Sequence, residues 1–147
     1  MVLGVFMSVF EKILVPLDGS GHSLNALEKA VQIAKKFDGK ITLINVYSVS
    51  SFKVTPSQVF SYVVEIRKSG ESILAEGEKM AKAEGVQVET RLKEGHIVEE
   101  ILKTSREGNF DLIVIGARGL SKMKEILLGS VSHGVTLHSP CPVLVVK

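Results

Sequence analysis

Short apolar runs alternate with longer amphipathic segments along almost the whole chain, and this alternation limits the possible folds more than any other feature. The runs predict strands over residues 12–17, 40–46, 86–92, 110–115 and 143–146. Between them, apolar residues at spacings of three and four predict helices over residues 23–37, 57–83, 97–106 and 131–138. Strands that alternate with helices build a parallel sheet covered on both faces. We therefore predict an α/β fold with five parallel strands.

Two details of these elements are predicted from local signals. Ser23 is a candidate N-cap of the first helix, whose apolar stripe is Leu24, Leu27, Val31, Ala34 and Phe37. Gly39 is expected to close that helix. The fourth strand, FDLIVI, is an unbroken apolar run, which predicts a strand buried on both faces.

Composition narrows the class of protein. The chain has 147 residues, enough for one domain, which we place over residues 11–147 after an N-terminal extension of residues 1–10. Lys and Arg number 18 against 16 Asp and Glu, without a basic block or any Trp, so nucleic acid is not expected as a partner. One Cys, no basic leader and no apolar run of membrane length favour a cytoplasmic protein without a membrane span.

The ends of two strands predict where a ligand binds. Parallel sheets bind ligands at the carboxyl ends of strands where the strand order reverses, under either a flavodoxin-like or a Rossmann-like winding. For five such strands the crevice lies between the first and the fourth, between the loops of residues 18–23 and 116–130. A second loop, residues 48–57, is long enough to cover a ligand there.

The 116–130 loop has the chemistry of an anion site. Gly116 and Gly119 let the backbone approach phosphate oxygens closely, while Gly129 and Ser130 precede a helix whose free N–H groups favour an anion. The alternative is that these glycines only form turns, which is the commoner role of each one taken singly. Their joint position at the expected crevice favours an anion site. Arg118, Lys122 and Lys124 are candidate phosphate contacts, Arg118 being the best placed.

Asp18 ends the first strand, and two interpretations of it remain open. It forms a turn with Gly19, or it belongs to the ligand site. A carboxylate beside phosphates needs a bridging Mg²⁺ or a contact to ribose hydroxyls. The four His residues lack metal-ligand spacing, and Cys141 has no partner for nucleophilic chemistry, so we expect structural roles for them.

The spacing Gly116-x2-Gly119-x9-Gly129-Ser130 resembles the G-x2-G-x9-G-[S/T] signature of ATP-binding universal stress proteins. The resemblance includes KILVPLDGS, Asn45-Val46, DLIVIGARG and SPCPVLVVK, and covers residues 11–147. It implies a Rossmann-like sheet of the adenine nucleotide alpha hydrolase type, with strand order 3-2-1-4-5. It also implies binding of ATP, with Mg²⁺ held through the phosphates and possible help from Asp18.

The same resemblance implies a role for each part of the site. Asp18 and its neighbours would line the nucleoside side, and the backbone of Val46 would meet the adenine edge. The first glycine pair would hold ribose and phosphate, and the residues from Gly129 onward would grip the triphosphate. The full set of expected contacts is Pro16, Leu17, Asp18, Val46, Ile115, Gly116, Ala117, Arg118, Gly119, Gly129, Ser130, Val131 and Ser132.

Motifs of rapid ATP chemistry are missing from the sequence. There is no Walker A loop, no G-x-S-x-G elbow and no second acid beside Asp18, so hydrolysis is expected to be slow and incidental. We expect a binding module in which nucleotide occupancy is the signal, and a homodimer formed through the apolar last strand, Val143–Val146. The alternatives are a stress-family dimer with an empty crevice, which acts through protein contacts, and a slow nucleotide hydrolase.

Overall fold

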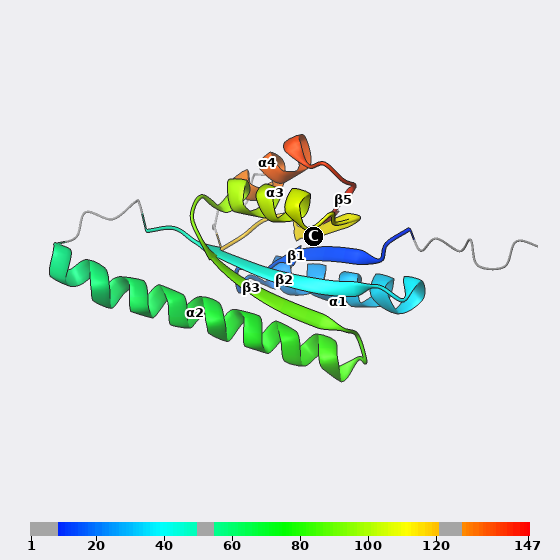
Figure 1. The fold of residues 1–147 in the computed structure, drawn as a ribbon, viewed down its shortest axis with the longest axis horizontal. Coiled ribbons are helices and arrows are strands. Elements are labelled where there is room, and N and C mark those ends of the chain that lie inside the picture. Colours follow the sequence, from blue (N-terminus) through cyan, green and yellow to red (C-terminus); the bar gives the residue numbers. More distant parts are fainter. Residues whose placement is uncertain (1–8, 50–54, 121–127) are drawn as a thin grey trace, which may run out of the picture.

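The computed structural model describes residues 9–49, 55–120 and 128–147 (Figure 1). In these residues, strands and helices alternate as predicted. Their order is β1 (Lys12–Pro16), α1 (Gly21–Phe37), β2 (Lys40–Tyr47), α2 (Pro56–Ala83), β3 (Val88–Glu94), α3 (Ile97–Glu107), β4 (Leu112–Gly116), α4 (Ser130–His138) and β5 (Val143–Val146). Most of the predicted N-terminal extension, half of the predicted 48–57 loop, and Lys122 and Lys124 lie outside the described residues.

The five strands form one parallel sheet in the order β3-β2-β1-β4-β5, which confirms the predicted order 3-2-1-4-5. β1 is central, with Ile13 opposite Ile41 of β2 on one side and opposite Leu112 of β4 on the other. The chain therefore reverses its direction of winding between β1 and β4. The predicted crevice lies at this reversal.

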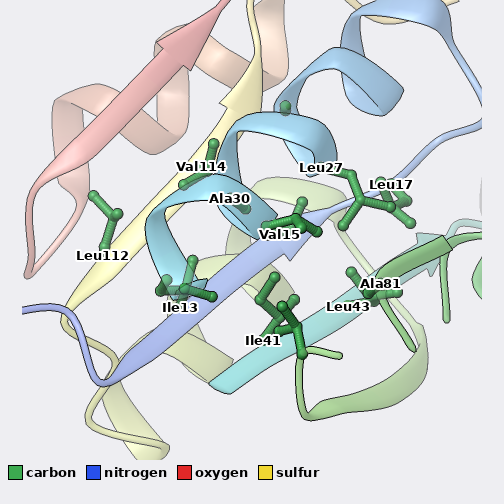
Figure 2. Close-up of a cluster of buried hydrophobic side chains, with 14 of the residues drawn as sticks. Ile13, Val15, Leu17, Leu27, Ala30, Ile41, Leu43, Ala81, Leu112 and Val114 are labelled. Atoms are coloured by element: carbon green, nitrogen blue, oxygen red, sulfur yellow. The ribbon is translucent and has the colours of Figure 1, made fainter. Parts of the chain in front are cut away.

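Helices cover both faces of the sheet, with α1 and α2 on one face and α3 and α4 on the other (Figure 1). β1 shows how the two layers arise, because Ile13 and Val15 pack under α1 while Leu14 packs under α3 and α4. Figure 2 shows the first of these two clusters. All of β4 is buried, which confirms that the LIVI part of the FDLIVI run forms a strand covered on both faces.

The start and end of α1 differ from prediction. Ser20, not Ser23, is the N-cap: its Oγ accepts the N–H of Ser23 at 3.1 Å, and the Ser23 hydroxyl donates back to the Ser20 carbonyl at 2.9 Å. The helix ends on Asp38 in the left-handed region (φ 54°), one residue before the predicted Gly39. Asp tolerates this conformation because its short polar side chain bonds locally. Phe37, predicted in the buried stripe, is 38% exposed and packs edge-on against Phe10.

The boundaries of β3 and β4 are shifted by one or two residues. Val86, predicted to begin the third strand, still donates its N–H to Ala81 at the end of α2, and pairing with β2 begins at Val88. Phe110, predicted to begin the fourth strand, donates its N–H to Ser105 of α3. In both places a buried apolar residue belongs to the end of a helix. The apolar runs that predicted the two strands do not distinguish such a residue from the first residue of a strand.

Helix α2 packs closely against the ends of β1 and β2 through two glycines, on the face of the sheet opposite α3 and α4. A Cβ added at Gly77 would lie 2.6 Å from Leu17 Cδ1, and one at Gly70 would lie 2.6 Å from Asn45 Oδ1. Asn45 itself is buried and donates to the Leu17 carbonyl at 2.8 Å. These contacts fix the chain where it leaves β1. Among the described helices, none is both long and apolar enough to cross a bilayer.

Candidate functional site

A cavity of about 250 Å³ opens at the carboxyl ends of β1 and β4, at the reversal of strand order. The predicted residues that line it are Pro16, Leu17, Asp18, Val46, Ile115, Gly116, Arg118, Gly119, Gly129, Ser130, Val131 and Ser132. Ala117, the remaining predicted residue, is buried and does not line the cavity. Segments far apart in the chain therefore meet around one cavity, as the sequence predicted.

Sequence reasoning missed five further residues of the lining: Ser23, Ile44, Ile97, Ile101 and Leu120. Ile97 and Ile101 stand four residues apart on α3 and so share one side of that helix. Their spacing predicted that they face inward, but not that α3 crosses over the crevice. Together with Ile44 they make part of the cavity apolar. An apolar wall of this kind suits the flat ring of a nucleobase.

Val46 owes its place in the cavity to the unequal lengths of β1 and β2. The Ile44 carbonyl accepts the N–H of Leu17 at 2.9 Å, so the Ile44 backbone points toward β1. Backbone direction repeats every second residue of a strand, so the N–H and C=O of Val46 also point to the β1 side. β1 ends at Pro16, opposite Ile44, and Val46 therefore lies past its end. One backbone donor and one acceptor face the crevice there.

Asp18 forms the turn that the sequence left open as one alternative, and it also lines the cavity. Its Oδ1 accepts the N–H of Ser20 at 2.9 Å, which is the Asx turn that leads into α1. Its Oδ2 lies beside Gly119, where an added Cβ would approach it to 2.6 Å. One carboxylate oxygen therefore shapes the turn while the other faces the 116–119 segment across the crevice.

The motif glycines divide into two kinds. A Cβ at Gly116 would lie 2.7 Å from the His22 carbonyl carbon and 2.8 Å from the Ser23 nitrogen, so Gly116 is required for β4 to approach the start of α1. Gly129 differs, because its φ of −69° suits any residue and a Cβ would lie 3.4 Å from its nearest neighbour, Arg118 Cα. Among the residues that the structure describes, the contacts require a glycine at 116 but not at 129.

The first turn of α4 faces the cavity. Gly129 is the N-cap and has no side chain to satisfy the N–H groups of that turn, and Ser130, Val131 and Ser132 line the cavity. The N-terminus of a helix carries free N–H donors and a partial positive charge. Arg118 adds a cationic side chain to the same lining. The combination favours an anionic ligand.

The cavity contains one carboxylate and no His or Cys in its lining, as far as the structure describes it. Across residues 9–49, 55–120 and 128–147, no three His, Cys, Asp or Glu side chains are placed to hold a metal ion. Cys141 lies away from this lining, with its Sγ 3.6 Å from the hydroxyl oxygens of Ser105 and Ser139.

Comparison with known proteins agrees with the geometry. The family described as "Universal stress protein family" matches residues 10–147. The universal stress protein YxiE of Bacillus subtilis (strain 168) is 37% identical over 148 residues, which cover 95% of this chain and 100% of that protein.

Solved structures give the same result. UspA, a universal stress protein from Lactobacillus plantarum, superposes with a TM-score of 0.84 at 25% identity, over 94% of this chain and 98% of that one. A universal stress protein solved in complex with cAMP superposes with a TM-score of 0.73 at 31% identity, over 95% of this chain and 99% of that one. Sequence and fold therefore point to the same group of proteins.

Proposed function

Because the chain belongs to the universal stress protein family, we propose that it binds an adenine nucleotide, ATP with Mg²⁺, in the crevice between β1 and β4. The observation that carries the proposal is Gly129. It lacks a side chain at the start of α4, where its described neighbours leave room for one, and residues of the first turn of α4 line the cavity. A relative solved in complex with cAMP supports an adenine ligand.

The base fits the β2 side of the cavity. The N–H and C=O of Val46 provide one donor and one acceptor past the end of β1. The edge of adenine has an acceptor nitrogen beside an amino donor and so complements this pair. Ile44, Ile97 and Ile101 provide apolar surface for the ring faces.

The phosphates fit the α4 side. Backbone N–H groups of Ser130 and Val131 lie in the first turn of α4, and Arg118 contributes positive charge. Asp18 would repel a bare triphosphate from the opposite side, and Mg²⁺ bound to the phosphates removes that repulsion. Mg²⁺ would take most of its ligands from phosphate and water, with Asp18 Oδ2 as the protein's contribution.

The proposed role is binding rather than rapid catalysis. The lining offers no His, Lys or second carboxylate that would activate a water molecule, as far as the described residues extend. Occupancy itself is then the signal, read by partners of a cytoplasmic homodimer that forms through β5. A slow turnover of ATP is compatible with this role and is not required by it.

Calorimetric titration of ATP with Mg²⁺ into nucleotide-stripped protein tests the proposal. We expect binding by the wild type and a loss of at least about tenfold in affinity in Gly129→Ala, since a methyl there would lie between α4 and the 117–119 backbone. Gly129→Val should bind still more weakly.

Gly21→Ala is the matched control. A Cβ at Gly21 has no neighbour within 4 Å, and the residue does not line the cavity. It should bind ATP like the wild type. Absence of binding by the folded wild type would refute the proposal and favour the alternative, a stress-family dimer that acts through protein contacts alone.

A further inference from the structure

Ser132 lines the cavity, but its hydroxyl is turned into the protein. The residue is 2% exposed. Its Oγ lies 2.7 Å from the Ala117 carbonyl oxygen and 3.1 Å from the Gly129 carbonyl oxygen, and it donates to both. A serine hydroxyl has one hydrogen. While that hydrogen is shared between these two carbonyls, Ser132 has none to give to a phosphate.

Ala117 is the common partner in this arrangement. Its carbonyl accepts a second hydrogen bond, from the N–H of Gly129 at 2.7 Å, and its own N–H donates to the Val146 carbonyl at 2.7 Å. The backbone of Ala117 is thus fixed to β5 through its N–H and to the start of α4 through its carbonyl. The end of β4 and the first turn of α4 are joined through this one residue.

This junction controls the geometry of the anion site. Arg118 and Gly119 follow Ala117 directly, and Ser130 and Val131, which line the cavity in the first turn of α4, follow Gly129. The distance between the two sets depends on the hydrogen bonds that the Ala117 carbonyl accepts. Donors held at a fixed separation bind an anion more tightly, because less order is lost on binding.

We infer that Ser132 is a positioning residue: its hydroxyl clamps α4 to Ala117 and so sets the separation of the two backbone segments that hold the phosphates. The inference rests on the proposed function and deepens it. It differs from a direct grip by Ser132 on the triphosphate, which the family resemblance alone implies. A phosphate would be held by the backbone of the first turn of α4, and the Ser132 side chain would act on it through that backbone.

The first test is a set of variants at position 132 titrated with ATP and Mg²⁺. Ser132→Thr keeps the hydroxyl, and Ser132→Val has the same shape as Thr without it. We expect the Val and Ala variants to lose about fivefold to tenfold in ATP affinity, as for one hydrogen bond, and Thr to retain most of it. Adenosine, which lacks phosphates, should bind all variants alike. Equal losses in the Thr and Val variants would show crowding and would overturn the inference.

The second test separates positioning from contact and needs no nucleotide. Amide hydrogen exchange of Gly129 reports its bond to the Ala117 carbonyl. In the ligand-free protein, Ser132→Ala and Ser132→Val should exchange this amide several times faster than the wild type and Ser132→Thr. Unchanged exchange combined with weaker ATP binding would mean that Ser132 contacts phosphate directly, and the inference would fail while the proposed function stood. A wild type that does not bind ATP would overturn both.

Discussion

The two edges of the sheet are built from opposite kinds of residue. β3 presents Glu89, Thr90 and Arg91 to solvent, with Arg91 Nη2 3.7 Å from Glu89 Oε2. β5 is four aliphatic residues long, and its Leu144 is 38% exposed. Charged side chains on an edge strand discourage pairing with another chain, whereas an aliphatic edge invites it. β3 is therefore a protected edge and β5 an open one.

Backbone direction shows which residues of each edge are available for pairing. Val146 and Pro142 turn their carbonyls to β4, so Val143 and Val145 turn their backbone groups outward. On the other edge, the Gln87 carbonyl accepts the N–H of Ile41 of β2. Backbone direction alternates along the strand, so the N–H and C=O of Thr90, three residues later, point away from β2. Pairing of two β5 edges about a two-fold axis would be antiparallel and would join two copies into one continuous sheet.

The largest expected effect is loss of the proposed dimer. Val145→Pro removes an outward N–H without removing a hydrogen bond to β4, so the fold should persist while β5 pairing is lost. Val145→Lys should act in the same direction by placing a charge at the edge. Light scattering should give monomer for both variants and dimer for the wild type.

Thr90→Pro is the corresponding change on the other edge and should leave the oligomeric state as it is in the wild type. A dimer that survives Val145→Pro, or one that Thr90→Pro dissociates, would show that the open edge has been assigned to the wrong strand.

A smaller effect is expected when the charges of β3 are removed. Glu89→Val with Arg91→Val makes that edge aliphatic, and we expect assemblies larger than a dimer at high concentration, measured by light scattering. The ion pair is exposed, so its loss alone should cost less than about 1 kcal/mol. Replacing both residues with Gln keeps the edge polar, and this control should not assemble further. Assembly of the Gln control would show that charge rather than polarity protects β3.

The smallest effect, close to none, is expected on nucleotide binding by the Val145→Pro monomer. No residue of β5 is among the described residues that line the cavity. We therefore expect the calorimetric affinity for ATP with Mg²⁺ to stay within about twofold of the wild-type value. A large loss would mean that the second copy shapes the site, in which case the open edge also serves ligand binding.

Sequence patterns predicted the strands best where burial is complete and uniform. The unbroken run of β4 and the boundaries of β5 were both predicted, and so was the strand order once the family resemblance was used. β3 was misplaced because Val86 is as apolar as a strand residue but bonds to the end of α2. Alternation in sequence cannot decide between those two partners.

The site was predicted in part for the same reason. Residues at strand ends, such as Asp18 and Gly119, follow from the general position of ligands in parallel sheets. Ile97 and Ile101 were missed as lining residues because their role depends on the path of α3 over the sheet. The difference between Gly116 and Gly129 could not be predicted either. Both are glycines of one motif, and the sequence does not show how closely other backbone atoms approach each of them.

The stagger between β1 and β2 has a consequence for how a ligand is selected. β1 ends at Pro16 while β2 continues to Tyr47. Beyond Pro16, the backbone groups of β2 that point toward β1 have no strand beside them. A base bound to Val46 would form hydrogen bonds with the backbone of β2 as a further residue of β1 would. The groups that distinguish one base from another are then the backbone N–H and C=O of position 46, which stay the same whichever side chain is there. Substitutions can therefore change the side chains that line such a site more easily than they can change its specificity for a base.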